Sequence, residues 1–341
     1  MKYFYLGAFP PTYGGVTIKN RDLFRILSQH LPMERVDFNR IKRHDGRETL
    51  RLVGALMGRD HTFVVGVSGK KTRKRFSGLL YWANRKAMNR SVLMVMGGTA
   101  ARDIAGDARY QKWAAQYKKV YVETEGMKKT LEDAGLANVG LYPNGRFTPR
   151  QTLPCRENSD RPLRCLFFSQ ISREKGTDIA LEGVKELPCV QLDLYGEVVP
   201  RYEADFKAAL SNCRNATYYG VFKGDPEEAY ALLNQYDVLL FPTRFAHEGV
   251  PGVLVETKIA GIPAVVSDIC YNAELVQDGE GIVLEENDAP HLARAIRRLD
   301  EDRELLFRMK QGSQQSAERF YIEQYIDELL EQLTASASVK N

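Results

Sequence analysis

The feature that most constrains the fold is a regular alternation of short apolar runs with stretches of helical periodicity. The apolar runs predict strands at residues 2–9, 63–67, 92–96, 120–122, 166–169, 192–195, 238–241 and 264–267. Strands that alternate with helices form parallel sheets covered by helices. A chain of 341 residues is longer than one hydrophobic core usually supports. The pattern therefore predicts an α/β protein with two parallel-sheet domains.

A domain boundary is expected near residue 150. Between Tyr142 and Pro162 the chain accumulates Pro, Asn, Arg, Thr and Ser and loses its apolar periodicity, so residues 145–162 are interpreted as a linker. We expect one domain at 1–150 and a second at 151–317. Residues 318–334 carry a further helical pattern.

Residues 241–256 predict a ligand site that contains two carboxylates. Glu248 lies just before an expected helix that begins at Pro251, Glu256 lies within that helix, and Gly261 is placed at its end. In open parallel sheets ligands bind beyond the carboxyl ends of the strands, where helix N-termini attract phosphates. One carboxylate can accept sugar hydroxyls and the other ribose hydroxyls, so the segment indicates a sugar-nucleotide site.

The spacing of Glu248 and Glu256 resembles the Glu-x7-Glu element of retaining glycosyltransferases of family 4, the group 1 glycosyl transferases. The resemblance implies a GT-B fold, in which two Rossmann-like domains face each other across a cleft. It also implies that residues 318–334 pack back on the first domain, which binds the acceptor, while residues 151–317 bind the nucleotide sugar.

Residues 166–176 resemble the Gly-Arg-Leu-(x)n-Lys-Gly element of the same family. Lys175 would then contact the donor diphosphate and, with Glu248, form the catalytic pair. Gln170 stands where the family usually has Arg, so one phosphate-binding cation is missing from its usual place. Arg173 is one candidate to replace it; the alternative is a solvated surface arginine.

The remaining donor-binding residues follow from the same resemblance. The Gly14-Gly15 loop resembles a family loop that faces the donor phosphates and the acceptor, and the segments around Tyr195 and Val221 resemble loops around the nucleotide base. The expected donor-binding set is Gly14, Gly15, Gln170, Arg173, Lys175, Tyr195, Gly196, Val221, Phe222, Glu248, Gly249, Val250, Pro251, Gly252, Val253 and Glu256.

No metal ion or other cofactor is expected. The one Asp-x-Asp triplet, residues 300–302, lies between charged helical segments and is interpreted as a solvated helix end. Lys175 and the helix that begins at Pro251 would offset the charge of the leaving diphosphate. The resemblance implies retention of anomeric configuration by attack on the same face, without a protein nucleophile.

Three positions leave alternatives open. Residues 95–99 read Val-Met-Gly-Gly-Thr, whereas many relatives carry a His near the end of the first domain's fourth strand. His247 is either a catalytic base or a solvated loop residue. Glu274 matches a common family position, and it could equally cap the following helix.

Charge divides the chain into two halves. Residues 1–150 hold 28 Lys and Arg against 12 Asp and Glu, whereas residues 151–341 hold 20 against 32. The densest basic run contains Lys70, Lys71, Arg73, Lys74 and Arg75 and is followed by Leu79, Leu80, Tyr81 and Trp82. A basic, amphipathic stretch suits an anionic membrane surface, and a solvated helix is the alternative. Nucleic acid is not expected, because no nucleic-acid-binding motif accompanies the run.

The sequence predicts a cytoplasmic protein, either free in the cytoplasm or peripheral at the inner face of the cell membrane. No apolar run approaches the roughly 20 residues that a membrane span needs, and no secretory segment is recognised. The five cysteines are scattered, which suits a reducing compartment.

Taken together, these observations predict a retaining, metal-independent hexosyltransferase of the GT-B fold. Its donor would be a nucleoside diphosphate sugar, with UDP favoured, and its acceptor a glycan or lipid-linked glycan. Bacterial surface polysaccharide biosynthesis, such as that of lipopolysaccharide or capsule, is the expected setting. The alternatives are a sugar-nucleotide epimerase of the same fold and a noncatalytic, membrane-associated assembly partner.

Overall fold

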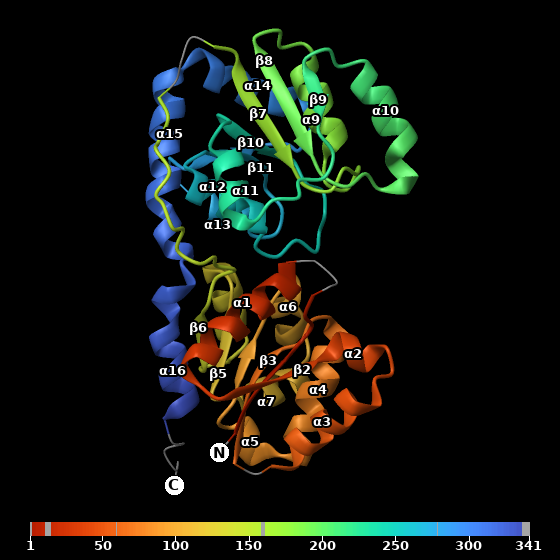
Figure 1. Ribbon diagram of the computed structural model, residues 1–341, viewed down its shortest axis with the longest axis vertical. Helices are drawn as coiled ribbons and strands as arrows, with labels where there is room; N and C mark the ends of the chain where they lie inside the picture. The colour runs from red at the N-terminus through yellow and green to blue at the C-terminus, as the bar shows by residue number, and fades with distance from the viewer. Residues whose placement is uncertain (1, 11–14, 59, 158–160, 278, 336–341) are drawn as a thin grey trace. The chain divides into compact units, whose positions relative to one another are not determined.

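The computed structural model describes residues 2–10, 15–58, 60–157, 161–277 and 279–335. The chain divides into two compact units (Figure 1). Unit 1 comprises Met1–Phe147 and Tyr321–Asn341, and unit 2 comprises Thr148–Phe320. The sequence placed these boundaries after residues 150 and 317.

Unit 1 is built on a six-stranded parallel sheet with the strand order β2-β1-β3-β4-β5-β6. Its strands are β1 (Lys2–Gly7), β2 (Met33–Asp37), β3 (His61–Gly66), β4 (Val92–Met94), β5 (Lys119–Val122) and β6 (Val139–Leu141). Its helices are α1 (Gly15–His30), α2 (Phe38–Lys42), α3 (Gly46–Met57), α4 (Lys70–Ala83), α5 (Arg85–Met88), α6 (Ala100–Ala105), α7 (Ala108–Ala114), α8 (Glu125–Asp133), η3 (Ile322–Tyr325) and α16 (Ile326–Thr334).

Unit 2 is built on a second six-stranded parallel sheet with the strand order β12-β11-β10-β7-β8-β9. Its strands are β7 (Leu163–Phe168), β8 (Val190–Tyr195), β9 (Ala216–Tyr218), β10 (Val238–Phe241), β11 (Ala264–Ser267) and β12 (Gly281–Leu284). Its helices are α9 (Thr177–Lys185), η1 (Pro200–Tyr202), α10 (Glu203–Ser211), α11 (Pro226–Leu233), α12 (Gly252–Ala260), α13 (Asn272–Leu275), α14 (Ala289–Glu301), α15 (Arg303–Gln315) and η2 (Ser316–Phe320). The predicted α/β class with two parallel sheets is confirmed.

Each unit has its own hydrophobic core. In unit 2, alternate residues of β7, namely Leu163, Cys165 and Phe167, join a buried cluster with side chains of α9 and α14. Every residue of the interior strands β10 and β11 is buried, as expected where helices cover both faces of a parallel sheet (Figure 1). In unit 1, Ile326, Leu329 and Leu333 of α16 pack into a cluster with residues of α1 and the sheet. Helix α16 thus belongs to the core of unit 1.

The strands that the sequence missed are the edge strands. β2 and β6 are the edges of one sheet, and β12 and β9 are the edges of the other. β2 reads Met-Glu-Arg-Val-Asp and only its last two residues are buried. Interior strands are buried on both faces and therefore appear as continuous apolar runs. The edge strands have three to five residues each, and β2 and β9 also contain polar residues.

A buried carboxylate fixes the amino-terminal end of β10. Asp237 accepts hydrogen bonds from Lys310 Nζ at 2.7 Å, from the backbone N–H of Arg164 at 2.9 Å and from both terminal nitrogens of Arg161 at 3.0 Å. The side chains of Asp237 and Lys310 are both 1% exposed. Because a buried charge is tolerated only when it is paired and hydrogen-bonded, this network ties β7, β10 and α15 together.

No helix among the described residues is both long enough and apolar enough to cross a lipid bilayer.

The buried tyrosines of unit 1 predict a loss of stability in alkaline solution. Burial raises the pKa of the phenols of Tyr5, Tyr110, Tyr117, Tyr121 and Tyr142. The folded state therefore keeps these protons after the unfolded chain, whose phenols titrate near about pH 10, has lost them. The contribution of these phenols to stability is complete below about pH 10. It is lost as the pH rises further, so the free energy of unfolding falls.

The measurement is urea denaturation at several pH values on either side of about pH 10, with tyrosinate absorbance recorded in parallel. We expect the absorbance of the buried phenols to rise together with unfolding. An unfolding free energy that stays constant through this range would contradict the prediction.

Candidate functional site

The candidate donor site lies at the carboxyl ends of β7 and β10, which are adjacent, parallel strands in unit 2. Residues 169–176 follow β7 and residues 242–251 follow β10. Because both loops leave the same edge of the sheet, the motif that contains Lys175 and the motif that contains Glu248 come together although 73 residues separate them in sequence.

The two loops approach each other so closely that one position must be glycine. Gly176 has φ 78°, and a Cβ atom added there would lie 1.9 Å from the carbonyl oxygen of Pro242. The backbone N–H of Arg244 donates to the carbonyl of Glu174 at 2.7 Å, and Thr243 Oγ1 donates to the same oxygen at 3.3 Å. The approach therefore fixes the position of Lys175 relative to the loop after β10.

Lys175 and Glu248 form an ion pair between Nζ and Oε2. Their side chains are 18% and 14% exposed, respectively, so both charges are largely withdrawn from bulk water but remain reachable. The ammonium also lies 4.9 Å from the centroid of the Phe245 ring, a favourable cation–π distance. The structure thus joins a cation and a carboxylate at the place where the sequence expected a diphosphate and a sugar.

Helix α12 begins beside this pair. Pro251 is the residue that precedes the helix, rather than its first residue as predicted, and the helix runs from Gly252 to Ala260. Gly261 ends it with φ 68°, as predicted. The first backbone N–H groups of a helix have no carbonyl acceptor within it and carry partial positive charge. The start of α12, with Gly249, Val250 and Val253 around it, is therefore suited to bind an anion.

Glu256 lies in α12, one turn beyond its start, and its side chain is half-buried. The two glutamates of the motif thus occupy different elements, the loop and the helix, as the sequence predicted. A ligand held at the helix start would have one carboxylate on either side along the chain.

Gln170 fills the position where the family usually has a cation, and Arg173, the candidate to replace that cation, lies near Asp178 of α9. Gln170 is exposed at the end of β7. The Arg173 side chain is 74% exposed, and its Nε lies 3.9 Å from Asp178 on α9. Arg244 donates to the same carboxylate at 2.7 Å. In this arrangement Asp178 orients both arginines, whereas Lys175 contacts Glu248.

The loops expected around the base carry an aromatic cluster. Tyr195 stacks on Tyr219 with ring centroids 5.1 Å apart, and Phe168 contacts Phe222 at 5.9 Å. Gly196 is required here, because a Cβ atom would lie 1.8 Å from the carbonyl oxygen of Ser169. Tyr219 and Val221 are about half exposed, so flat apolar surface is available beside the end of β8.

The comparison with known families identifies this half of the chain. A profile of the family described as "Glycosyl transferases group 1" matches residues 154–316, a range that contains both glutamates, Lys175 and the aromatic loops. Residues 154–316 therefore belong to the glycosyl transferases group 1 family. The resemblance seen in the sequence motifs is confirmed for this glycosyl transferase domain.

Two curated relatives are glycosyltransferases. AmsK, the amylovoran biosynthesis glycosyltransferase of Erwinia amylovora, is 27% identical over 183 residues, or 50% of this chain and 42% of AmsK. The alpha-D-kanosaminyltransferase of Streptomyces kanamyceticus is 24% identical over 238 residues, or 68% of this chain and 57% of that protein. The chain thus spans about half the length of these relatives.

The whole chain also matches a solved structure. The crystal structure of HepE from Anabaena in complex with UDP covers 98% of this chain and 100% of HepE, with a TM-score of 0.71 and 15% sequence identity. At this identity the match establishes the fold, which is the GT-B fold of glycosyltransferases.

Two further residues named in the sequence analysis have local structural settings. His247 is exposed and its ring lies 5.7 Å from that of Phe245. Glu274 lies within the short helix α13 and is half-buried. The alternatives given above for His247 and Glu274 therefore stay as they were.

The glycine loop of unit 1 is described only in part. Gly14 lies outside the described residues, and Gly15 is the exposed first residue of α1. The carboxyl edge of this sheet instead carries an ion pair that sequence reasoning missed. Lys19 Nζ lies 3.0 Å from Glu123, which accepts the backbone N–H of Gly97 at 3.2 Å. Burial lowers the pKa of Lys19, and Glu123 opposes that shift.

The structure corrects the predicted basic surface at Arg73. Arg73 is buried, and its guanidinium donates to Tyr110 Oη at 3.0 Å and to the carbonyl of Met96 at 3.3 Å. Lys70 pairs with Asp103 at 3.1 Å, and Lys74 pairs with Asp107. Helical periodicity turns these side chains toward α6 and α7, and Lys71 and Arg75 remain exposed on the outer side of α4.

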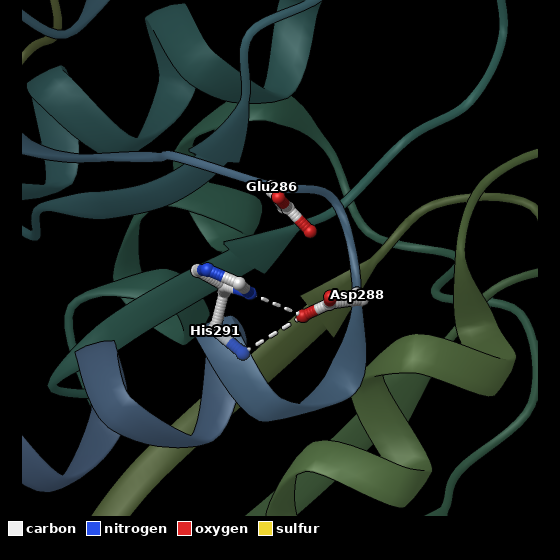
Figure 2. Close-up of side chains that lie close together, drawn as sticks. All are labelled: Glu286, Asp288 and His291. Atoms are coloured by element: carbon white, nitrogen blue, oxygen red, sulfur yellow. Dashed lines mark hydrogen bonds and ion pairs between the residues drawn. The ribbon is translucent and has the colours of Figure 1, made fainter.

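A cluster of three potential metal ligands in the glycosyl transferase domain is explained by helix capping. Figure 2 shows Glu286, Asp288 and His291 just before and within the first turn of α14. Asp288 accepts the backbone N–H of His291 at 2.9 Å and contacts its Nδ1 at 2.7 Å. These hydrogen bonds lower the pKa of Asp288, and they account for the position of both side chains.

The Asp-x-Asp triplet has similar structural roles. Asp302 caps α15 by accepting the backbone N–H of Leu305 at 2.8 Å, and Asp300 pairs with Arg303.

The sequence analysis also missed residues that support the donor site. Thr243 is buried; its carbonyl accepts hydrogen bonds from Ser267 Oγ at 2.7 Å and Asn287 Nδ2 at 3.0 Å. Phe245 supplies the ring beside Lys175. Both residues lie within the segment 241–256, but the motif assigns a role to neither. Their roles become visible only when the loop after β10 is placed beside those after β7, β11 and β12.

We predict that Gly176→Ala destabilises unit 2 more than Gly220→Ala does. Both glycines have nearly the same φ, 78° and 80°, so an alanine at either position costs about 1 kcal/mol of backbone strain. Only Gly176 faces a backbone carbonyl, and relieving that clash adds about 1–3 kcal/mol. Nothing lies within 4 Å of the Cβ position of Gly220, which makes it the matched control.

Urea denaturation of the two variants, followed by circular dichroism, measures the difference. An equal decrease in the free energy of unfolding in the two variants would show that the contact with Pro242 is not tight.

Proposed function

We propose that this protein is a retaining glycosyltransferase that moves a hexose from a nucleoside diphosphate sugar, with UDP favoured, to a glycan or lipid-linked acceptor. The observation that carries the proposal is the ion pair of Lys175 and Glu248 beside the start of α12. Bacterial surface polysaccharide biosynthesis is the proposed setting. The name of AmsK, an amylovoran biosynthesis glycosyltransferase, supports the setting, and the complex of HepE with UDP supports the donor.

The proposed role of Lys175 is to stabilise the leaving diphosphate. As the bond between the anomeric carbon and the phosphate oxygen breaks, negative charge grows on that oxygen. An ammonium held by Glu248 and Phe245, together with the N-terminus of α12, is placed in advance of the reaction and needs little reorganisation. These groups can neutralise the charge without a metal ion, so metal independence is part of the proposal.

The proposed role of Glu248 is to bind hydroxyls of the donor sugar, and that of Glu256 is to bind the ribose. A carboxylate with 14% of its side chain exposed forms charge-assisted hydrogen bonds that are stronger than those between neutral groups. When the donor binds, its phosphate replaces part of the contact that Lys175 makes with Glu248, which frees the carboxylate for the sugar. The loops at Tyr195, Gly196, Val221 and Phe222 would surround the base.

Retention of configuration follows from attack on the face that the diphosphate leaves. The acceptor oxygen forms the new bond to the anomeric carbon, and its proton passes to the departing phosphate oxygen. Because the phosphate oxygen takes the acceptor's proton, no protein base is needed, and the proposed reaction does not require His247. We propose that unit 1 binds the acceptor and that the protein works in the cytoplasm, peripherally at the inner face of the membrane.

The test is release of nucleoside diphosphate from UDP-, GDP-, ADP- and dTDP-sugars, with and without a lipid extract and with EDTA present. We expect acceptor-stimulated release of UDP that EDTA leaves unchanged. Lys175→Met should lower kcat roughly 100-fold or more, because it removes charge stabilisation in the transition state. Glu248→Gln should lower kcat/KM roughly 10- to 100-fold, the range expected when a hydrogen bond to a charged group is lost.

Lys207→Met is the matched control, since it breaks an exposed ion pair with Glu203 on α10 in the same unit. Arg173→Ala should have a much smaller effect than Lys175→Met, because the arginine is exposed and faces Asp178. If no donor is turned over or bound by calorimetry, the noncatalytic assembly partner is favoured. Conversion of the sugar without release of nucleotide would identify an epimerase.

A further inference from the structure

The large hydrophobic side chains that are exposed in the described part of the chain fall into two groups. Tyr219, Val221 and Phe245 lie in the loops of the candidate donor site. The others, Leu50, Val53, Met57, Leu79 and Trp82, lie on α3 and α4 of unit 1. A monomeric protein rarely gathers exposed apolar residues on one surface without a binding role. The second group therefore indicates a binding surface.

Each helix presents these residues along a single stripe. On α4, Lys71, Arg75, Leu79 and Trp82 are spaced by three or four residues and are all exposed. On α3, Leu50, Val53 and Met57 have the same spacing and exposure. Residues at this spacing share one helix face. Each helix therefore carries apolar side chains on its solvent-exposed face as well as on its buried face.

Hydrogen bonds join the C-terminal ends of α3 and α4. Asn84, the residue after α4, donates from Nδ2 to the carbonyls of Leu56 and Gly58 at the end of α3, both at 2.9 Å. The last turns of the helices are thereby tied together, and α3 and α4 lie side by side in Figure 1. Met57 is 78% exposed and Trp82 is 80% exposed, so each of the two tied helices carries a highly exposed apolar side chain in its last turn.

Both tryptophans of the chain line the adjoining groove between α4 and α7. This groove of about 560 Å³ is formed by Tyr81, Trp82, Ala108, Arg109, Lys112 and Trp113. Arg85 lies 5.1 Å from the centroid of the Tyr81 ring. Aromatic rings flanked by arginine and lysine are typical of the boundary between lipid headgroups and acyl chains.

The charge of the surface selects the partner. Residues 46–90 contain 11 Lys and Arg and two acidic residues, of which Glu48 is buried. Arg73 is also buried and Lys70 and Lys74 are paired, but Lys71 and Arg75 remain exposed on the outer side of α4. We propose that the outer faces of α3 and α4, with the groove beside α7, form a docking surface for a bilayer that contains anionic lipids. Trp82, Met57 and Leu79 enter the interface, while Lys71 and Arg75 contact headgroups.

This surface differs from the basic run expected from sequence. Arg73 is buried and Lys70 and Lys74 are paired with acidic residues of unit 1, whereas Leu50, Val53 and Met57 lie outside that run. A second copy of the chain fits less well, because a symmetric contact would gather Lys71 and Arg75 of both copies in one interface. The inference rests on the proposed function in one respect: membrane docking would bring the enzyme to the lipid-linked acceptor that the proposed function includes.

The experiment uses vesicles of phosphatidylcholine alone and of phosphatidylcholine with phosphatidylglycerol. In the Trp113→Phe variant Trp82 is the single tryptophan, and we expect its emission to shift to shorter wavelength with the anionic vesicles. Sedimentation of the same mixtures should show binding that Met57→Ser with Trp82→Ser weakens about tenfold or more. Lys71→Glu with Arg75→Glu should weaken it similarly, since each charge near an anionic surface contributes to binding.

Lys128→Glu with Lys129→Glu on α8 changes the net charge equally and is the control that should retain binding. Failure to bind anionic vesicles, or equal weakening by the α8 control, would overturn the proposal. So would a dimer in sedimentation velocity that the Met57 and Trp82 substitutions dissociate. Release of nucleotide from the donor is measured separately, so a protein that turns over donor but ignores vesicles refutes only this inference.

Discussion

The candidate donor site depends on the contact between the backbone of Gly176 and the carbonyl of Pro242. A side chain at Gly176 would occupy the space of that carbonyl, 1.9 Å from its Cβ position. The contact joins the loops after β7 and β10 and thereby places Lys175 against Glu248 at the start of α12. Without it, the two charges would have to be brought together by flexible loops, and each would pay more conformational entropy to reach its working position.

Buried ion pairs hold the sheets that carry this contact. Asp237 binds Lys310 and Arg161 at the amino end of β10, and Lys258 of α12 pairs with Glu280 at 2.6 Å. Burial lowers the pKa of Lys258 and Glu280 raises it. Pairs of this kind add little net stability, but each is costly to break singly because it leaves an uncompensated buried charge. They fix which elements are neighbours and so give the loops a rigid base.

The sequence was most informative where burial or a ligand constrains several consecutive residues. The interior strands were predicted because they are apolar on both faces, while the short edge strands β2, β6, β9 and β12 were not. The spacing of Glu248 and Glu256 and the glycine at 261 placed the motif correctly on a loop and a helix. Thr243, Asn287 and the pair of Lys19 with Glu123 were missed, since their partners are distant in sequence and no local pattern marks them.

The sequence by itself determined the α/β class, the two parallel sheets and the family of residues 154–316, because periodicity and motif spacing are local properties of the chain. Only the tertiary structure decided which charges work as pairs and which sides of the helices are exposed. Arg73 and Arg75 are two residues apart in one basic run, yet one is buried and the other exposed. A helix turns about 100° per residue, and only the packing of α4 against α6 and α7 determines which direction faces the core.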